Sequence, residues 1–117
     1  MSYVDGFVLA APKANMDAYR KMTELACEVW MDNGALAYVE AVGDEVPYGE
    51  VTSFPRAVQA KEDEEVIFSW IVYPSREVRD AVNAKVMSDP RVQGDEWRDV
   101  FDGKRMIYGG FRPFIER

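Results

Sequence analysis

The chain has 117 residues, of which 48% are hydrophobic and 30% are charged, a balance typical of a globular, water-soluble protein. Its 21 acidic and 14 basic residues give a formal net charge of −7, which disfavours binding to nucleic acid and to anionic membranes. Histidine is absent and Cys27 is the only cysteine. Ser-His-Asp and Cys-His catalysis, His-ligated haem and His- or Cys-rich zinc sites are therefore excluded.

The same numbers constrain domain organisation and location. The length fits one domain over residues 1–117. No apolar run approaches the ~20 residues of a membrane span. The N-terminus has an acid at Asp5 and no basic start before an apolar core, so we expect no signal peptide. A lone cysteine fits a reducing compartment. We expect a cytoplasmic protein without a metal or a cofactor.

The first third of the chain predicts a strand, a helix and a second strand. The segment 3–11 is apolar on both of its alternating faces and is ended by Pro12, which predicts a central strand. Asn15 is a suitable N-cap for a helix that ends at Asn33-Gly34. Its apolar residues recur at helical spacing. Residues 35–42 form the predicted second strand.

The remainder predicts a strand, a helix and a closing strand. Three features precede the last helix: a long ordered loop over 45–61, a solvated acidic turn over 62–65, and a strand over 66–73 that is apolar on both faces. Ser75 is the predicted N-cap of a helix that stops at Asp89-Pro90. We expect a polar connector over 91–100 and a last strand over 105–115.

This order of elements predicts an α+β fold, the ferredoxin-like βαββαβ sandwich, with two helices on one face of an antiparallel sheet. That architecture leaves the other face open to water, yet the first and third strands are apolar on both faces. We therefore expect a homodimer, packed sheet to sheet as a dimeric α/β barrel.

Two carboxylates, Asp5 and Glu40, lie in apolar strands, where an unpaired charge is costly to bury. One interpretation is an acid/base or recognition pair at a pocket. The other is an ordinary salt bridge to Arg79, Lys104 or Arg105, or exposure at the edge of an interface.

Other candidates carry a weaker signal. Ser69 and Trp70 point to opposite faces of their strand and offer a hydroxyl and a ring, or simply core packing. Arg79 could clamp a carboxylate ligand or form a surface pair, and Tyr38 could edge an aromatic pocket.

We interpret Cys27 as a packing residue. The pair Gly109-Gly110 suggests the close approach of another backbone.

Six segments of the chain form a distinctive set of motifs: 3–7 (YVDGF), 34–36 (GAL), 52–55 (TSFP), 68–71 (FSWI), 79–80 (RD) and 101–111 (FDGKRMIYGGF). Together they resemble the YbaA-like family, the bacterial domain of unknown function DUF1428. It covers essentially the whole chain and implies the dimeric α/β-barrel fold. The wider superfamily includes cofactor-free monooxygenases, isomerases and ligand-sensing modules, so the resemblance implies no single activity.

Two functional hypotheses follow. In the first, a pocket between sheet and helices, edged by Asp5, Tyr38, Glu40 or Arg79, binds a small apolar or aromatic ligand with one polar group. In the second, the protein is a cofactor-independent monooxygenase or isomerase that uses a carboxylate or tyrosine as the base.

Overall fold

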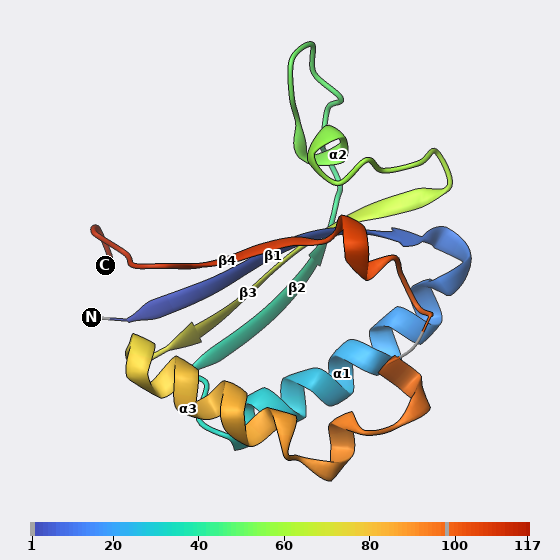
Figure 1. The fold of residues 1–117 in the computed structure, drawn as a ribbon. Coiled ribbons are helices and arrows are strands. Elements are labelled where there is room, and N and C mark those ends of the chain that lie inside the picture. Colours follow the sequence, from blue (N-terminus) through green and yellow to red (C-terminus); the bar gives the residue numbers. More distant parts are fainter. Residues whose placement is uncertain (1, 98) are drawn as a thin grey trace.

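The computed structural model describes residues 2–97 and 99–117 and has the predicted ferredoxin-like βαββαβ fold. Its sheet has the order β2-β3-β1-β4, and each pair of neighbouring strands is antiparallel. The strands are β1 (Tyr3–Pro12), β2 (Ala37–Val42), β3 (Glu64–Tyr73) and β4 (Ile107–Phe111). The helices α1 (Met16–Asp32) and α3 (Arg76–Met87) lie on one side of this sheet (Figure 1).

The long helices form where sequence pattern and capping agree. The buried residues of α1 recur every three or four positions, and Gly34 closes the helix with φ of +122°, a conformation that favours glycine. Ser75 caps α3 by accepting a hydrogen bond from the Val78 amide at 3.1 Å. Asn15 occupies the predicted cap position of α1, but its side chain donates to the Val100 carbonyl at 3.0 Å instead of capping the helix.

The core between the sheet and these helices has two parts. One joins α1 to β1 and β3 through Leu9, Tyr19, Met22 and Ile67. The other joins α1, α3 and β3, with a completely buried Tyr73. Trp97 packs against the first part from η3 (Asp95–Trp97). The connector predicted to be polar therefore contributes to the core. None of the helices in the described ranges combines the length and apolarity that crossing a membrane requires.

Several predicted boundaries are wrong for identifiable reasons. Strand β3 begins at Glu64, inside the predicted solvated turn, because the Glu64 carboxylate is held by Arg105 at 2.7 Å. Strand β4 ends at Phe111 rather than at residue 115. Phe111 pairs with Val4, next to the start of β1, and Pro113 has no amide hydrogen for a ladder. Strand β2 starts at Ala37, two residues later than predicted.

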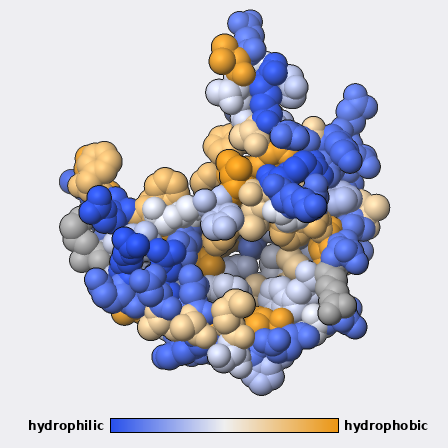
Figure 2. Space-filling model, viewed as in Figure 1, coloured by the Kyte–Doolittle hydropathy of each residue, from blue (hydrophilic) through white to orange (hydrophobic). Residues whose placement is uncertain are grey.

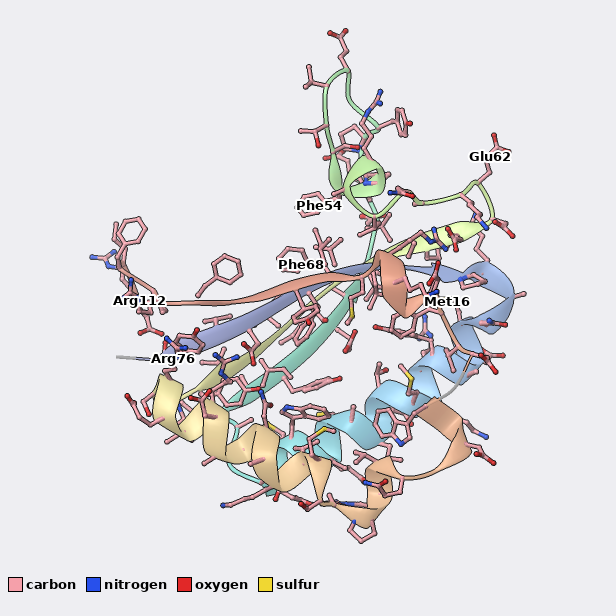
Figure 3. The ribbon with its side chains drawn as sticks, in the orientation of Figure 1. Met16, Phe54, Glu62, Phe68, Arg76 and Arg112 are labelled. Atoms are coloured by element: carbon pink, nitrogen blue, oxygen red, sulfur yellow. The ribbon has the colours of Figure 1, made fainter. Side chains whose placement is uncertain are left out.

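The predicted long loop forms an arm, residues 43–63, on the side of the sheet away from α1 and α3 (Figure 1). It contains the four-residue helix α2 (Phe54–Ala57), which the sequence pattern did not indicate. The Ser53 hydroxyl caps α2 by accepting from the Arg56 amide at 3.1 Å. The arm contacts the sheet where the Phe54 ring meets the Phe68 ring edge-on (Figure 3).

The sheet face away from α1 and α3, which we call the open face, is apolar and only partly covered. Phe68 is 42% exposed and Phe111 is 63% exposed on it. The prediction that the first and third strands are buried on both faces is therefore not met within one chain. The residues that line the groove on this face include Val4, Val8, Phe68, Trp70, Ile107 and Phe111.

Candidate functional site

A cavity of about 290 Å³, which we call the inner chamber, lies between the sheet and the helices. It is lined mostly by apolar and aromatic side chains from β1, β2, β3, α1 and the segment that precedes β4. Figure 2 shows the molecule hollowed between these two layers. The lining residues that matter for its chemistry are Phe7, Tyr19, Trp30, Tyr38, Glu40 and Phe101.

Glu40 is the charged group of the inner chamber. Its two carboxylate oxygens each accept a hydrogen bond, Oε1 from the Tyr19 hydroxyl at 2.7 Å and Oε2 from the Tyr38 hydroxyl at 2.8 Å. Burial raises the pKa of Glu40, and the two hydroxyl donors partly oppose this rise. Burial and the neighbouring carboxylate also raise the pKa of both tyrosines. The tyrosines therefore stay protonated as donors, and Glu40 is a better proton acceptor than an exposed carboxylate.

The strand geometry explains this cluster. Tyr38 and Glu40 are two residues apart on β2, so both project toward the helices. Glu40 is directly opposite Ser69 on β3, and the buried Ser69 also lines the inner chamber. Tyr19 comes from the buried side of α1, which packs over β2. A strand pair and one helix thus bring two phenols, a hydroxyl and a carboxylate together.

A second cavity of about 360 Å³, the Arg79 cavity, lies beside the inner chamber and shares Phe7 and Trp30 with it. Its lining includes the charged residues Asp5 and Arg79, and the Arg79 guanidinium nitrogens lie 3.1 Å from Asp5 and 2.9 Å from Asp80. Burial raises the pKa of Asp5, although Arg79 acts in the opposite direction. Arg79 therefore neutralises carboxylates of the protein itself.

Gly110 lines the Arg79 cavity and allows β4 to lie close to the side chain of Tyr3. A Cβ at this position would lie 2.2 Å from the Tyr3 hydroxyl oxygen, and that hydroxyl also accepts a hydrogen bond from Arg79 at 3.3 Å. The sequence predicts that the glycine pair admits a neighbouring backbone. For Gly110 the close neighbour is instead the side chain of Tyr3.

The structure divides the predicted site residues into three places. Tyr38, Glu40 and Ser69 line the inner chamber, whereas Asp5 and Arg79 line the Arg79 cavity. Trp70 lies on the open face, away from both cavities.

Of the alternatives left open for the two carboxylates, the Asp5–Arg79 salt bridge is present. Arg105 pairs with Glu64 and Asp102 instead of with Asp5 or Glu40. A ligand-binding role for any of these residues stays a prediction.

Several residues that line the inner chamber are not among the predicted site residues. Tyr19 and Trp30 belong to the predicted apolar stripe of α1, and the sequence shows Phe101 only as part of the closing motif. The spacing of Tyr19 and Trp30 predicts correctly that both face the sheet. It does not reveal that the Tyr19 hydroxyl meets a carboxylate 21 residues away in the chain.

In the part of the chain that the structure describes, no group of three or more Cys, Asp and Glu side chains is placed to hold a metal ion. The polar groups of the inner chamber include one carboxylate, several hydroxyls and the indole N–H groups of Trp30 and Trp97. Their chemistry is hydrogen bonding and proton acceptance.

Comparison with known proteins gives the relationships of the chain. The model of the family described as "Protein of unknown function (DUF1428)" matches residues 2–103. The uncharacterized protein YbaA of Escherichia coli K12 is 55% identical over 116 residues, which cover 99% of each chain. YbaA of Shigella flexneri is equally similar, with 55% identity and 99% coverage.

Two solved structures share the fold at low sequence identity. A protein from an uncultured marine organism, described as a dimeric ferredoxin-like protein, has a TM-score of 0.61 at 12% identity and covers 99% of this chain and 98% of its own. A NIPSNAP family protein of unknown function from Agrobacterium tumefaciens has a TM-score of 0.60 at 15% identity, with 96% and 87% coverage. The two solved structures support the fold alone, which is ferredoxin-like. The family model and the similarity to YbaA show that the chain belongs to the DUF1428 family.

Proposed function

We propose that the protein binds a small, mostly apolar, planar ligand in the inner chamber. The observation that carries this proposal is an apolar cavity whose wall keeps a carboxylate and two tyrosine hydroxyls together. Binding pockets for small molecules have this composition, mainly apolar with a few convergent polar groups. At about 290 Å³ the chamber is close to the lower end of the usual range of roughly 300–1,000 Å³, which suits a ligand of one or two rings.

We further propose that the protein acts as a homodimer joined through the open face. The chain exposes 7967 Å² of surface, whereas a compact monomer of its 13.4 kDa mass exposes about 6,500 Å². The excess is larger than the ~800 Å² that each partner buries in a standard interface. A second copy of this sheet is the occupant that fits, since one solved structure with the same fold is described as dimeric.

A groove of about 810 Å³ lies on the open face, but we do not assign the ligand there. The groove is lined almost entirely by apolar groups, including Val8, Phe68, Ile107 and Phe111, and it belongs to the surface that dimerisation would cover. The inner chamber, by contrast, combines apolar rings with a partly buried carboxylate.

A catalytic role is the second candidate, and Glu40 is the observation that favours it. A partly buried carboxylate with a raised pKa can accept a proton from a bound substrate, as a general base does. Tyr19 and Tyr38 would hold the carboxylate in position. This corresponds to a cofactor-independent isomerase or monooxygenase that acts on a small aromatic substrate.

A thermal-shift screen of small aromatic and quinone-like compounds tests the binding proposal. A ligand at about 100 times its Kd should stabilise the protein by about 2.7 kcal/mol and raise Tm by several degrees. Ala26→Leu places a larger side chain in the wall of the inner chamber and should remove this rise. Ala84→Leu, on the exposed side of α3, is the matched control and should keep it.

The outcomes separate the two candidates. If no compound raises Tm and calorimetry detects no binding, the chamber is not a ligand site. Binding without turnover supports the binding role. Oxygen consumption or product formation that Glu40→Gln abolishes, while the ligand still binds, would support catalysis.

A further inference from the structure

The surroundings of Glu40 also indicate which chemical class of ligand the inner chamber takes. The inference rests on the proposed binding function and adds to it a choice between neutral and anionic ligands. It starts from the partners of Glu40: both are phenol hydroxyls, and both donate to the carboxylate, at 2.7 and 2.8 Å. The protein thus already uses this carboxylate to bind two phenols.

Glu40 retains capacity for a further donor. An ionised carboxylate has about four acceptor positions on its two oxygens, and the two tyrosines occupy one on each oxygen. Glu40 also lines the cavity, so a ligand in the chamber can reach it. Ser69, directly opposite on β3, contributes a second hydroxyl to the same wall.

The charge on this wall selects against anions. Across residues 2–97 and 99–117, no lysine or arginine forms an ion pair with Glu40. Within the described part of the chain, the titratable groups that face the Tyr38–Glu40 cluster are Tyr19 and Cys27, both from α1. Arg79, in the neighbouring cavity, is already paired with two carboxylates. A ligand carboxylate in the inner chamber would therefore meet a like charge, with no free cation among the described residues to offset it.

The remaining lining fits the body of an aromatic ring. Phe7, Trp30 and Phe101 present rings, and Met22 presents a thioether that packs well against aromatic edges. These groups bind a flat apolar body without regard to its charge. The choice between ligands of the same shape is left to Glu40.

We propose that the inner chamber is a site for neutral phenol-class ligands, in which the ligand hydroxyl donates a hydrogen bond to the Glu40 carboxylate beside Tyr19 and Tyr38. A ligand of the same shape that lacks the hydroxyl hydrogen loses this bond. A carboxylate of the same shape is repelled. No covalent step is involved.

Three probes of nearly the same shape test this proposal: 2-naphthol, 2-methoxynaphthalene and 2-naphthoate. Their affinities for the full chain are measured by isothermal titration calorimetry at pH 7, where the naphthol is neutral and the naphthoate is an anion. A hydrogen bond to a charged acceptor corresponds to a preference of about tenfold or more for the naphthol over its methyl ether. The naphthoate should bind most weakly of the three.

The variant Glu40→Gln removes the charge and should reduce the preference for naphthol over its ether to about threefold or less. It should also strengthen binding of the naphthoate. Glu24→Gln, an exposed change on α1 that alters net charge by the same amount, is the control and should leave the order of affinities unchanged. The comparison of the three probes on the unaltered chain decides the question even if Glu40→Gln folds poorly.

Each failure has its own meaning. Equal binding of 2-naphthol and 2-methoxynaphthalene, or tighter binding of 2-naphthoate, overturns the ligand class while leaving the chamber as a binding site. If none of the three binds and the broader aromatic screen is also negative, the proposed function and this inference fall together.

Discussion

The buried side chain of Tyr3 limits the size of the residue at position 110 in the last strand, β4. It is 6% exposed, its hydroxyl accepts from Arg79, and the Arg79 guanidinium lies 4.9 Å from the centre of its ring. Its ring also fills the space where Gly110 has no side chain. The glycine in β4 therefore serves a buried contact within the chain.

Gly110→Ala should destabilise the protein by about 1–3 kcal/mol, because the new Cβ must displace the buried Tyr3 ring. Urea denaturation monitored by circular dichroism measures the change in the free energy of unfolding. Gly103→Ala is the matched control, since a Cβ at Gly103 would meet no atom within 4 Å. Equal unfolding midpoints for the two variants would contradict the role given to Tyr3.

At the scale of secondary-structure elements, Arg105 fastens the segment before β4 to the sheet. It lies in η4 (Gly103–Arg105), binds Glu64 of β3 at 2.7 and 2.8 Å, and donates to the Gln59 carbonyl of the arm at 2.8 Å. Asp102 accepts from the same guanidinium at 3.0 Å. One arginine therefore joins the closing turn, the start of β3 and the base of the arm.

This ion pair predicts a pH dependence of stability. The hydrogen bond from Arg105 lowers the pKa of Glu64 from 4.5 to about 2. A lowered pKa in the folded state means that the stabilisation is complete above pH 4.5 and is lost as the pH falls toward 2. Glu64→Gln should reduce the free energy of unfolding at pH 7 by about 1–3 kcal/mol.

The difference between Glu64→Gln and the unaltered chain should shrink as the pH falls through this window. Chemical denaturation at a series of pH values measures it. Glu62→Gln, an exposed neighbour in the same turn, is the control and should cost little at any pH. A difference that stays constant from pH 7 to pH 2 would show that the Glu64 charge is not what stabilises this region.

At the scale of the whole molecule, the notable property is excess surface. The radius of gyration is 14.8 Å, against about 13.4 Å for a compact chain of this length. The arm and the C-terminal segment both extend beyond the sheet, and each carries exposed apolar side chains such as Val51 and Phe114. A second copy packed on the open face would cover much of this surface.

Phe111→Glu tests the dimer. Phe111 is 63% exposed in one chain, so a charge there should leave the fold intact, but it would place a carboxylate in the proposed interface. Sedimentation at micromolar concentration should show a dimer for the unaltered chain and a monomer for the variant. Leu36→Glu, at an exposed apolar residue between α1 and β2, is the control and should remain dimeric. A monomeric unaltered chain would refute the interface.

Much of the fold could be predicted from local patterns. The apolar runs in β1 and β3, the apolar stripe of α1 and the cap at Ser75 all identify their elements correctly, because each pattern acts within a few residues. Ends of elements were less predictable. Strand β4 ends opposite the start of its partner β1. Strand β3 extends to Glu64 because the Glu64 carboxylate binds Arg105, which is 41 residues away in the chain.

By itself the sequence determined the element order, the acidic balance and the exclusion of histidine chemistry, since these follow from residue types and short spacings. It also marked Asp5 and Glu40 as unusual. Only the tertiary structure decided what each is: Asp5 pairs with Arg79, 74 residues away, whereas Glu40 faces two tyrosines across a cavity. Burial and long-range partners determine the chemistry of a carboxylate, and neither is encoded in its immediate neighbours.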